Sequence, residues 1–179
     1  MKLALLFSVL CLESGAAQVP DNLKPPETEA LLLKAVGKGT QIYTCKATSA
    51  DADARFEWVL DKPDAQLFDE RSEPIGTHYK GPTWEAMDGS KVIGEVVQRA
   101  KSPRLDAVPW LLLKTKATEG GGRFGRVTYV QRVNTIGGSA DRLRRMAAIR
   151  STSARSRGSG TRPITIFSGG GKGTAEGTA

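Results

Sequence analysis

The chain contains a single histidine, and the chemistry that this residue can perform is proton transfer. His78 is followed closely by two carboxylates, Glu85 and Asp88. A neutral imidazole near a carboxylate can act as a general base, because its pKa normally lies near neutral pH. The spacing assigns no serine or cysteine nucleophile to His78. The alternative is a histidine in a loop or at a strand end that makes local hydrogen bonds, and we favour this structural role. Catalysis by His78 with Asp88 or Glu85 is therefore our second hypothesis.

Aromatic and polar side chains around the same segment suggest binding instead. Trp84 lies between a Pro-Thr pair and Glu85, outside any apolar run, whereas Trp58 and Trp110 lie in apolar patterns typical of a core. We therefore expect Trp58 and Trp110 to be buried and Trp84 to be available to a ligand. The candidate ligand-binding residues are Tyr79, Trp84, Arg132 and Asn134. An exposed aromatic surface favours a carbohydrate or a cell-surface component as the ligand.

Two other kinds of site are not predicted. Gly120, Gly122 and Gly125 match the glycine spacing of a dinucleotide-binding loop. That loop must open a helix, whereas Val127–Val133 has the pattern of a strand, so the glycines indicate a turn and we expect no cofactor. One histidine and scattered carboxylates are too few for a metal centre, so we expect no metal.

The first residues have the pattern of a secretory signal. Lys2 precedes an apolar run over Leu3–Leu12, and small residues follow at Gly15–Ala17. The run is shorter than the roughly 20 residues that span a bilayer. We therefore expect residues 1–17 to be a cleaved signal peptide, with no transmembrane span, and the protein to be secreted to the periplasm or the extracellular space.

Cys45 is the only cysteine outside the predicted signal peptide, because Cys11 lies within it. A single cysteine in an exported protein suggests a missing partner or a reactive thiol. No base that would activate it lies nearby in sequence. We interpret Cys45 as a structural cysteine that is unpaired in this chain.

Strand-like segments separated by turns must position these residues. Asp88-Gly89, between two apolar runs, predicts a hairpin, and residues 30–36 and 40–47 predict another around Gly37–Gly39. Further strands are expected over residues 55–60, 66–69, 75–79, 83–87, 91–99, 108–115 and 123–135. No amphipathic helix precedes residue 140. Residues 18–139 thus predict one all-β domain, an antiparallel sandwich or barrel.

The C-terminal 40 residues differ from this domain. Residues 140–179 hold eight Lys or Arg and two acids, which accounts for +6 of the net charge of +7. Binding to nucleic acid or to an anionic surface through this tail is our third hypothesis. However, Arg150–Gly160 has no aromatic side chain on which a base can stack. We expect the tail to be irregular or disordered, without a nucleic-acid partner.

Several segments together resemble one exported family. They are Val19–Leu23, Gln41–Cys45, Phe56–Leu60, Gly76–Tyr79, Gly81–Glu85, Asp88–Val92, Pro109–Leu112 and Tyr129–Gly138. The chain closely resembles the bacterial and fungal domain-of-unknown-function family numbered 3455. The resemblance implies no established activity. Some fungal members carry a malate dehydrogenase label, which this sequence does not support because the glycine spacing indicates a turn. We therefore expect a non-catalytic binding or surface-associated module.

The chain departs from that family after Gly137-Gly138. The resemblance implies a Thr-Gly-Cys segment and a final aromatic strand, and the chain has neither. Codons can be chosen for residues 163–169 such that a shifted frame encodes Asp-Tyr-Tyr-Phe-Phe-Arg. We therefore expect the tail to be frameshifted. We also expect a sheet with an unpaired edge, no disulfide partner for Cys45, and poor folding.

Overall fold

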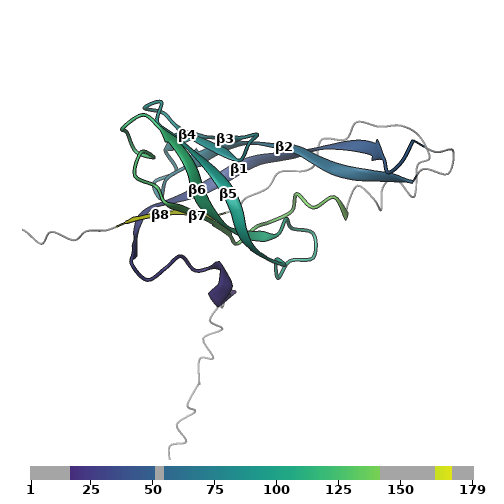
Figure 1. Cartoon of the computed structure of the whole chain (residues 1–179), viewed down its shortest axis with the longest axis horizontal. Coiled ribbons are helices and arrows are strands. Elements are labelled where there is room, and N and C mark those ends of the chain that lie inside the picture. The colour runs from purple at the N-terminus through teal and green to yellow at the C-terminus, as the bar shows by residue number, and fades with distance from the viewer. Residues whose placement is uncertain (1–16, 51–54, 142–163, 171–179) are drawn as a thin grey trace, which may run out of the picture.

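The structure is a closed barrel of eight antiparallel strands, seen in Figure 1. It is a computed structural model, and it describes residues 17–50, 55–141 and 164–170. Each strand pairs with the next along the chain, and the last pairs with the first. The strands are β1 (Glu29–Ala47), β2 (Phe56–Phe68), β3 (Pro74–Tyr79), β4 (Thr83–Ala86), β5 (Lys91–Ala100), β6 (Trp110–Glu119), β7 (Tyr129–Val133) and β8 (Ile164–Gly170). The predicted all-β fold is confirmed.

The side chains form one core inside the barrel and a second outside it. Trp84, Val92 and Leu113 belong to the inner cluster. The 3-10 helix η1 (Asp21–Leu23) places Leu23 against Trp110, on the outer face of β6, in the second cluster. The first half of β6 is therefore covered on both faces, which explains why Trp110–Leu113 is a continuous apolar run without alternation.

The expected hairpin around Gly37–Gly39 is wrong, because β1 continues straight through these residues. A Cβ atom on Gly39 would lie 2.1 Å from the backbone oxygen of Asp64. This glycine therefore permits close approach of β2 and is not needed for a turn.

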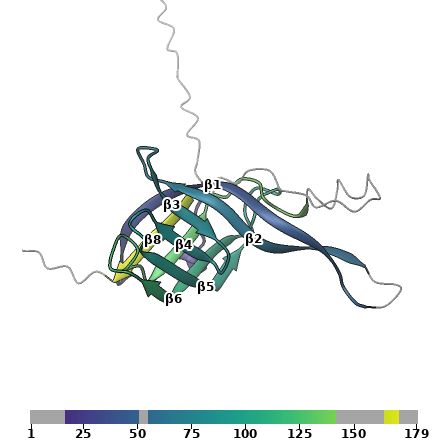
Figure 2. The same ribbon diagram turned by 90° about the horizontal axis from the view of Figure 1, so that it is seen from above.

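The distal part of β1 and β2 forms an arm that projects beyond the barrel (Figure 2). We use "the arm" for residues 43–47 and 56–60. Pairing of β1 with β8 ends at Val36, and pairing of β2 with β3 begins at Ala65, so the arm is a two-stranded ribbon. Phe56 is 73% exposed there and Trp58 is only partly buried. The predicted core position of Trp58 is thus wrong, since the alternation that suggested it belongs to the arm.

The hairpin at Asp88-Gly89 is confirmed as the turn between β4 and β5. Gly89 adopts a φ of 81°, which favours glycine. Asp88 accepts hydrogen bonds from the backbone nitrogen and hydroxyl of Ser90 and from the backbone nitrogen of Arg123. These bonds lower the pKa of Asp88 to about 2. The loop holding Gly120–Gly125 leads into β7, which confirms the predicted turn.

Part of the C-terminal tail differs from the expectation of an irregular segment. Residues 164–170 form β8, which pairs with both β1 and β7. The run Ile164–Phe167 consists of β-branched and aromatic residues, which favour strands. The expected unpaired edge is therefore wrong, and the expectation of poor folding loses that support. Of the rest of the tail, only residues 140–141 are described by the structure. The predicted signal peptide also lies outside the described residues, except for Ala17.

Candidate functional site

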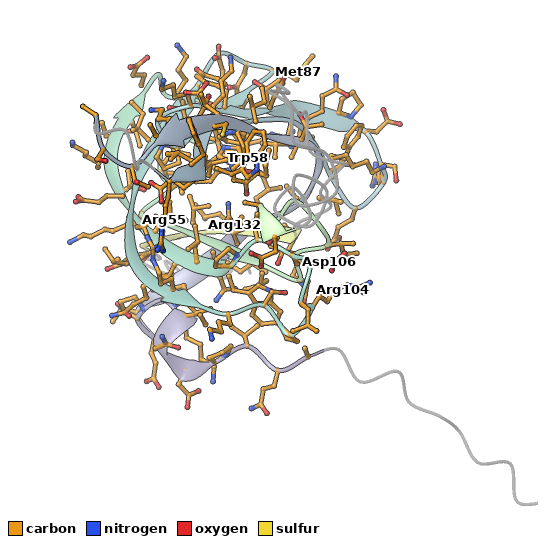
Figure 3. The ribbon with its side chains drawn as sticks, turned by 90° about the vertical axis from the view of Figure 1, so that its right-hand side faces the viewer. Arg55, Trp58, Met87, Arg104, Asp106 and Arg132 are labelled. Carbon is orange, nitrogen blue, oxygen red and sulfur yellow. The ribbon has the colours of Figure 1, made fainter. Side chains whose placement is uncertain are left out.

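A cavity of about 320 Å³ opens at the end of the barrel from which the arm projects. Strands β1 to β7 all contribute to its wall. Its apolar surface comes from Trp84, Val96, Leu111 and Leu113, together with Leu60 at the base of the arm. Figure 3 views the molecule from the side of the arm and shows Arg132 inside the ring of strands. A second hollow, on the outer surface near Ile93 and Lys116, contains none of the candidate residues.

His78 and Trp84 are cross-strand partners on β3 and β4 and both line this cavity. Their rings stack at 4.4 Å between centroids with an interplanar angle of 7°. A Cβ atom on Gly94 would lie 3.2 Å from the Trp84 ring, so the small residue leaves room for the indole. The expectation that Trp84 is exposed is wrong, since it is 1% exposed. Trp84 is available to a ligand only through the cavity.

The hydrogen bonding of His78 fixes its tautomer. Nδ1 lies 2.9 Å from the backbone oxygen of Thr83, and that oxygen can only accept, so Nδ1 carries the proton. Nε2 is then an acceptor. Burial lowers the pKa of His78 to about 4, the hydrogen bond to Thr83 opposes this, and the charge of Arg132 adds to it. His78 is therefore neutral at physiological pH.

Arg132 places a cation in the same cavity. It lies on β7 opposite Leu111 of β6, at an inward position. Its Nη2 donates to the backbone oxygen of Pro109 at 2.9 Å, while its buried Nε has no hydrogen-bond partner among the described residues. Burial lowers the pKa of Arg132 to about 10, with a further lowering from nearby Arg99 against a raising effect of Tyr43. The guanidinium thus stays charged at neutral pH.

No carboxylate of the described residues neutralises Arg132. The three ion pairs found there are Lys24–Asp21, Lys80–Asp61 and Lys91–Glu119. Asp61 does line the cavity, but its carboxylate accepts from Lys80 at 3.2 Å. A buried charge that lacks a counter-charge is costly, because desolvation is not offset by attraction. The cavity therefore has the electrostatics of an anion site.

Gln41 adds an acceptor to the cavity. Its side chain is 4% exposed, and its Oε1 has no hydrogen-bond partner among the described residues. A buried acceptor without a donor is unusual and costs about 1–3 kcal/mol. Gln41 Oε1 and His78 Nε2 thus offer two acceptors in a cavity that also holds a cation.

The other predicted site residues lie elsewhere. Tyr79 Oη donates to Glu85 Oε2 at 2.8 Å, and these residues alternate with His78 and Trp84 along β3 and β4, so they face outward. Asp88 is bound in its turn, and Asn134 follows β7 with a φ of 53°. Neither carboxylate proposed for His78 lines the cavity. Of the candidate residues, the structure brings together His78, Trp84 and Arg132.

Sequence reasoning missed Gln41 and Arg99, which also line the cavity. Strand phase was a usable signal: on β7, Arg132 lies two residues after the buried Val130 and therefore shares its inward face. Cys45 is exposed on the arm and forms no disulfide. Within the described ranges, no three potential metal ligands cluster, and no helix is long and apolar enough to cross a bilayer.

One of the comparisons with known proteins found a match, and it covers most of the barrel. The model of a family described as a protein of unknown function, DUF3455, matches residues 25–145. This range includes every strand except β8. The chain has no match among curated proteins and none among solved structures.

Proposed function

The chain belongs to the DUF3455 family of proteins of unknown function, and we propose that this member is an exported, non-catalytic module that binds a small organic acid. One observation carries the proposal. Arg132 lines the cavity with a partly buried guanidinium, and its buried Nε has no hydrogen-bond partner among the described residues. A bound carboxylate would supply the missing counter-charge through two parallel hydrogen bonds.

The cavity wall defines the rest of the ligand. Trp84, Leu111 and Leu113 favour an apolar body next to the acid group. Gln41 Oε1 and His78 Nε2 favour a hydroxyl or amide donor on that body. A neutral sugar would leave Arg132 without a counter-charge, so a carbohydrate would fit this site only if it carried an acid group.

Catalysis receives less support. The pKa of about 4 makes His78 a weak base, and Glu85 and Asp88 have other hydrogen-bond partners. The predicted signal peptide supports export. Binding through the basic tail rests on sequence alone, since most of that tail lies outside the described residues.

Titration calorimetry with phenylacetate and its neutral analogue phenylacetamide tests the proposal. We expect the acid to bind at least about tenfold more tightly, because a hydrogen bond to a charged group contributes about 1.5–3 kcal/mol. Arg132→Met should remove this preference. Arg126→Met, which removes an exposed arginine from the β6–β7 loop, should leave it unchanged. Equal affinities for acid and amide, or an unchanged preference in Arg132→Met, would overturn the proposal.

A further inference from the structure

We infer that the arm extends the binding site and that the ligand is a carboxylic acid with a long apolar chain. The inference rests on the proposed function, since it places the acid group at Arg132. The chain would run outward from the cavity along one face of the arm. This face, which we call the inner face, consists of Tyr43, Cys45, Ala47, Phe56, Trp58 and Leu60.

Strand register places these six residues on the same side as the cavity. On β1, Tyr43, Cys45 and Ala47 continue the inward phase of Gln41. On β2 the inward phase includes Pro63 and Leu67, which would direct the even-numbered residues outward.

An irregularity in the β1–β2 ladder reverses this phase. Ile42 pairs with Lys62 and Tyr43 pairs with Leu60, so Asp61 is the extra residue of a bulge. Beyond the bulge, Phe56, Trp58 and Leu60 share a face with Tyr43 and Cys45. Without it, these apolar side chains would lie on the opposite face of the arm from the cavity.

The inner face is apolar, and its outer part is exposed. Phe56 is 73% exposed and Leu60 is 45% exposed, and Cys45 and Ala47 are exposed as well. Trp58 is partly buried, and Tyr43 is buried where the arm joins the barrel. The opposite face carries Lys46 and Glu57. A contiguous exposed apolar surface of this kind usually marks a binding site.

Two observations identify the occupant as a long-chain acid. Leu60 belongs both to the inner face and to the cavity wall, so the apolar surface is continuous from the arm into the barrel. Two cations, Arg99 and Arg132, line the cavity at the inner end of that surface. A ligand that satisfies both parts has an anionic group at one end and an extended apolar body.

Cys45 provides a reporter of arm occupancy, because it is exposed and lies opposite Trp58 on the inner face. The test measures the rate at which iodoacetamide alkylates Cys45 in the full chain carrying Cys11→Ser. When the palmitate concentration is about ten times its dissociation constant, only about one-tenth of the protein is free of ligand. Palmitate should therefore slow the alkylation of Cys45 about tenfold. Butanoate, which is too short to leave the cavity, should not slow it.

The affinity series butanoate, octanoate, dodecanoate and palmitate gives a second readout. Each methylene that becomes buried should strengthen binding by about fourfold, which corresponds to about 0.8 kcal/mol. The double substitution Phe56→Ser and Trp58→Ser should abolish protection by palmitate and flatten the upper part of the series. Val59→Ser, an apolar-to-polar change on the other face of the same strand, is the matched control and should do neither.

The outcomes separate this inference from the proposed function. If phenylacetate still requires Arg132 while palmitate leaves Cys45 unprotected, the arm is not part of the site and the inference is wrong. If the protection of Cys45 depends on the protein concentration and not on the palmitate concentration, the inner face is a contact between two copies of the chain. The inference is wrong in that case too. Failure of the phenylacetate test overturns the proposed function itself.

Discussion

At the scale of single residues, the inward strand positions explain which polar side chains meet. Arg132, His78 and Gln41 occupy inward positions on β7, β3 and β1, and all three line the cavity. Tyr79 and Glu85 are as close to His78 and Trp84 in sequence, yet they face outward and bind each other. Proximity in sequence was therefore a poor guide to the site, and strand phase is a better one.

His78 gives the barrel a pH dependence that one substitution can isolate. Burial lowers its pKa from 6.5 in the unfolded chain to about 4, so protonation favours unfolding. Its contribution to stability is complete above pH 6.5 and is lost as the pH falls from about 6.5 to about 4. The full loss is on the order of 3 kcal/mol.

We expect His78→Gln to remove this dependence while retaining a donor toward Thr83. Chemical denaturation between pH 7 and pH 4 provides the measurement. The unfolding free energy of the wild type should fall more steeply than that of the variant. Parallel curves would contradict the burial of a neutral His78.

At the scale of elements, β8 determines whether the sheet has edges. It pairs with β7 over Tyr129–Val133 and with β1 over Glu29–Val36. Without it, both of those strands would present unpaired backbone groups, which promote aggregation.

Truncation after residue 163 should therefore lower the denaturation midpoint and promote aggregation. The expected loss is a large share of the total stability, which is about 5–15 kcal/mol for a domain of this kind. Truncation after Gly170 keeps β8 and is the matched control. Equal midpoints for the two truncated chains would show that β8 does not close the barrel in solution.

The elements also show how far the sequence could be interpreted. Asp88-Gly89 was recognisable because the turn itself requires a residue with positive φ. Gly37–Gly39 looks similar in sequence, but Gly39 is required because β2 packs closely against it at Asp64. That contact depends on the pairing of the two strands and cannot be predicted from the local sequence. Phe56, Trp58 and Leu60 alternate correctly, yet alternation does not distinguish a core face from the face of a projecting arm. The covered outer face of β6 and β7 likewise depends on η1, a long-range contact.

At the scale of the whole molecule, the barrel and the arm form one continuous apolar surface with cations at its inner end. The net charge of +7 does not describe this site, because most of it resides in the tail. The frameshift expected for that tail stays a prediction that the gene's DNA would test.

The binding of a ligand's acid group by Arg132 inside the barrel can be observed at the guanidinium itself. The measurement is nuclear magnetic resonance of the arginine Nε–H groups during titration with phenylacetate. We predict that the Arg132 Nε–H resonance shifts and becomes protected from exchange with water, while Arg126 is unchanged. An Arg132 resonance that stays unmoved at saturating phenylacetate would show that Arg132 does not bind the acid group.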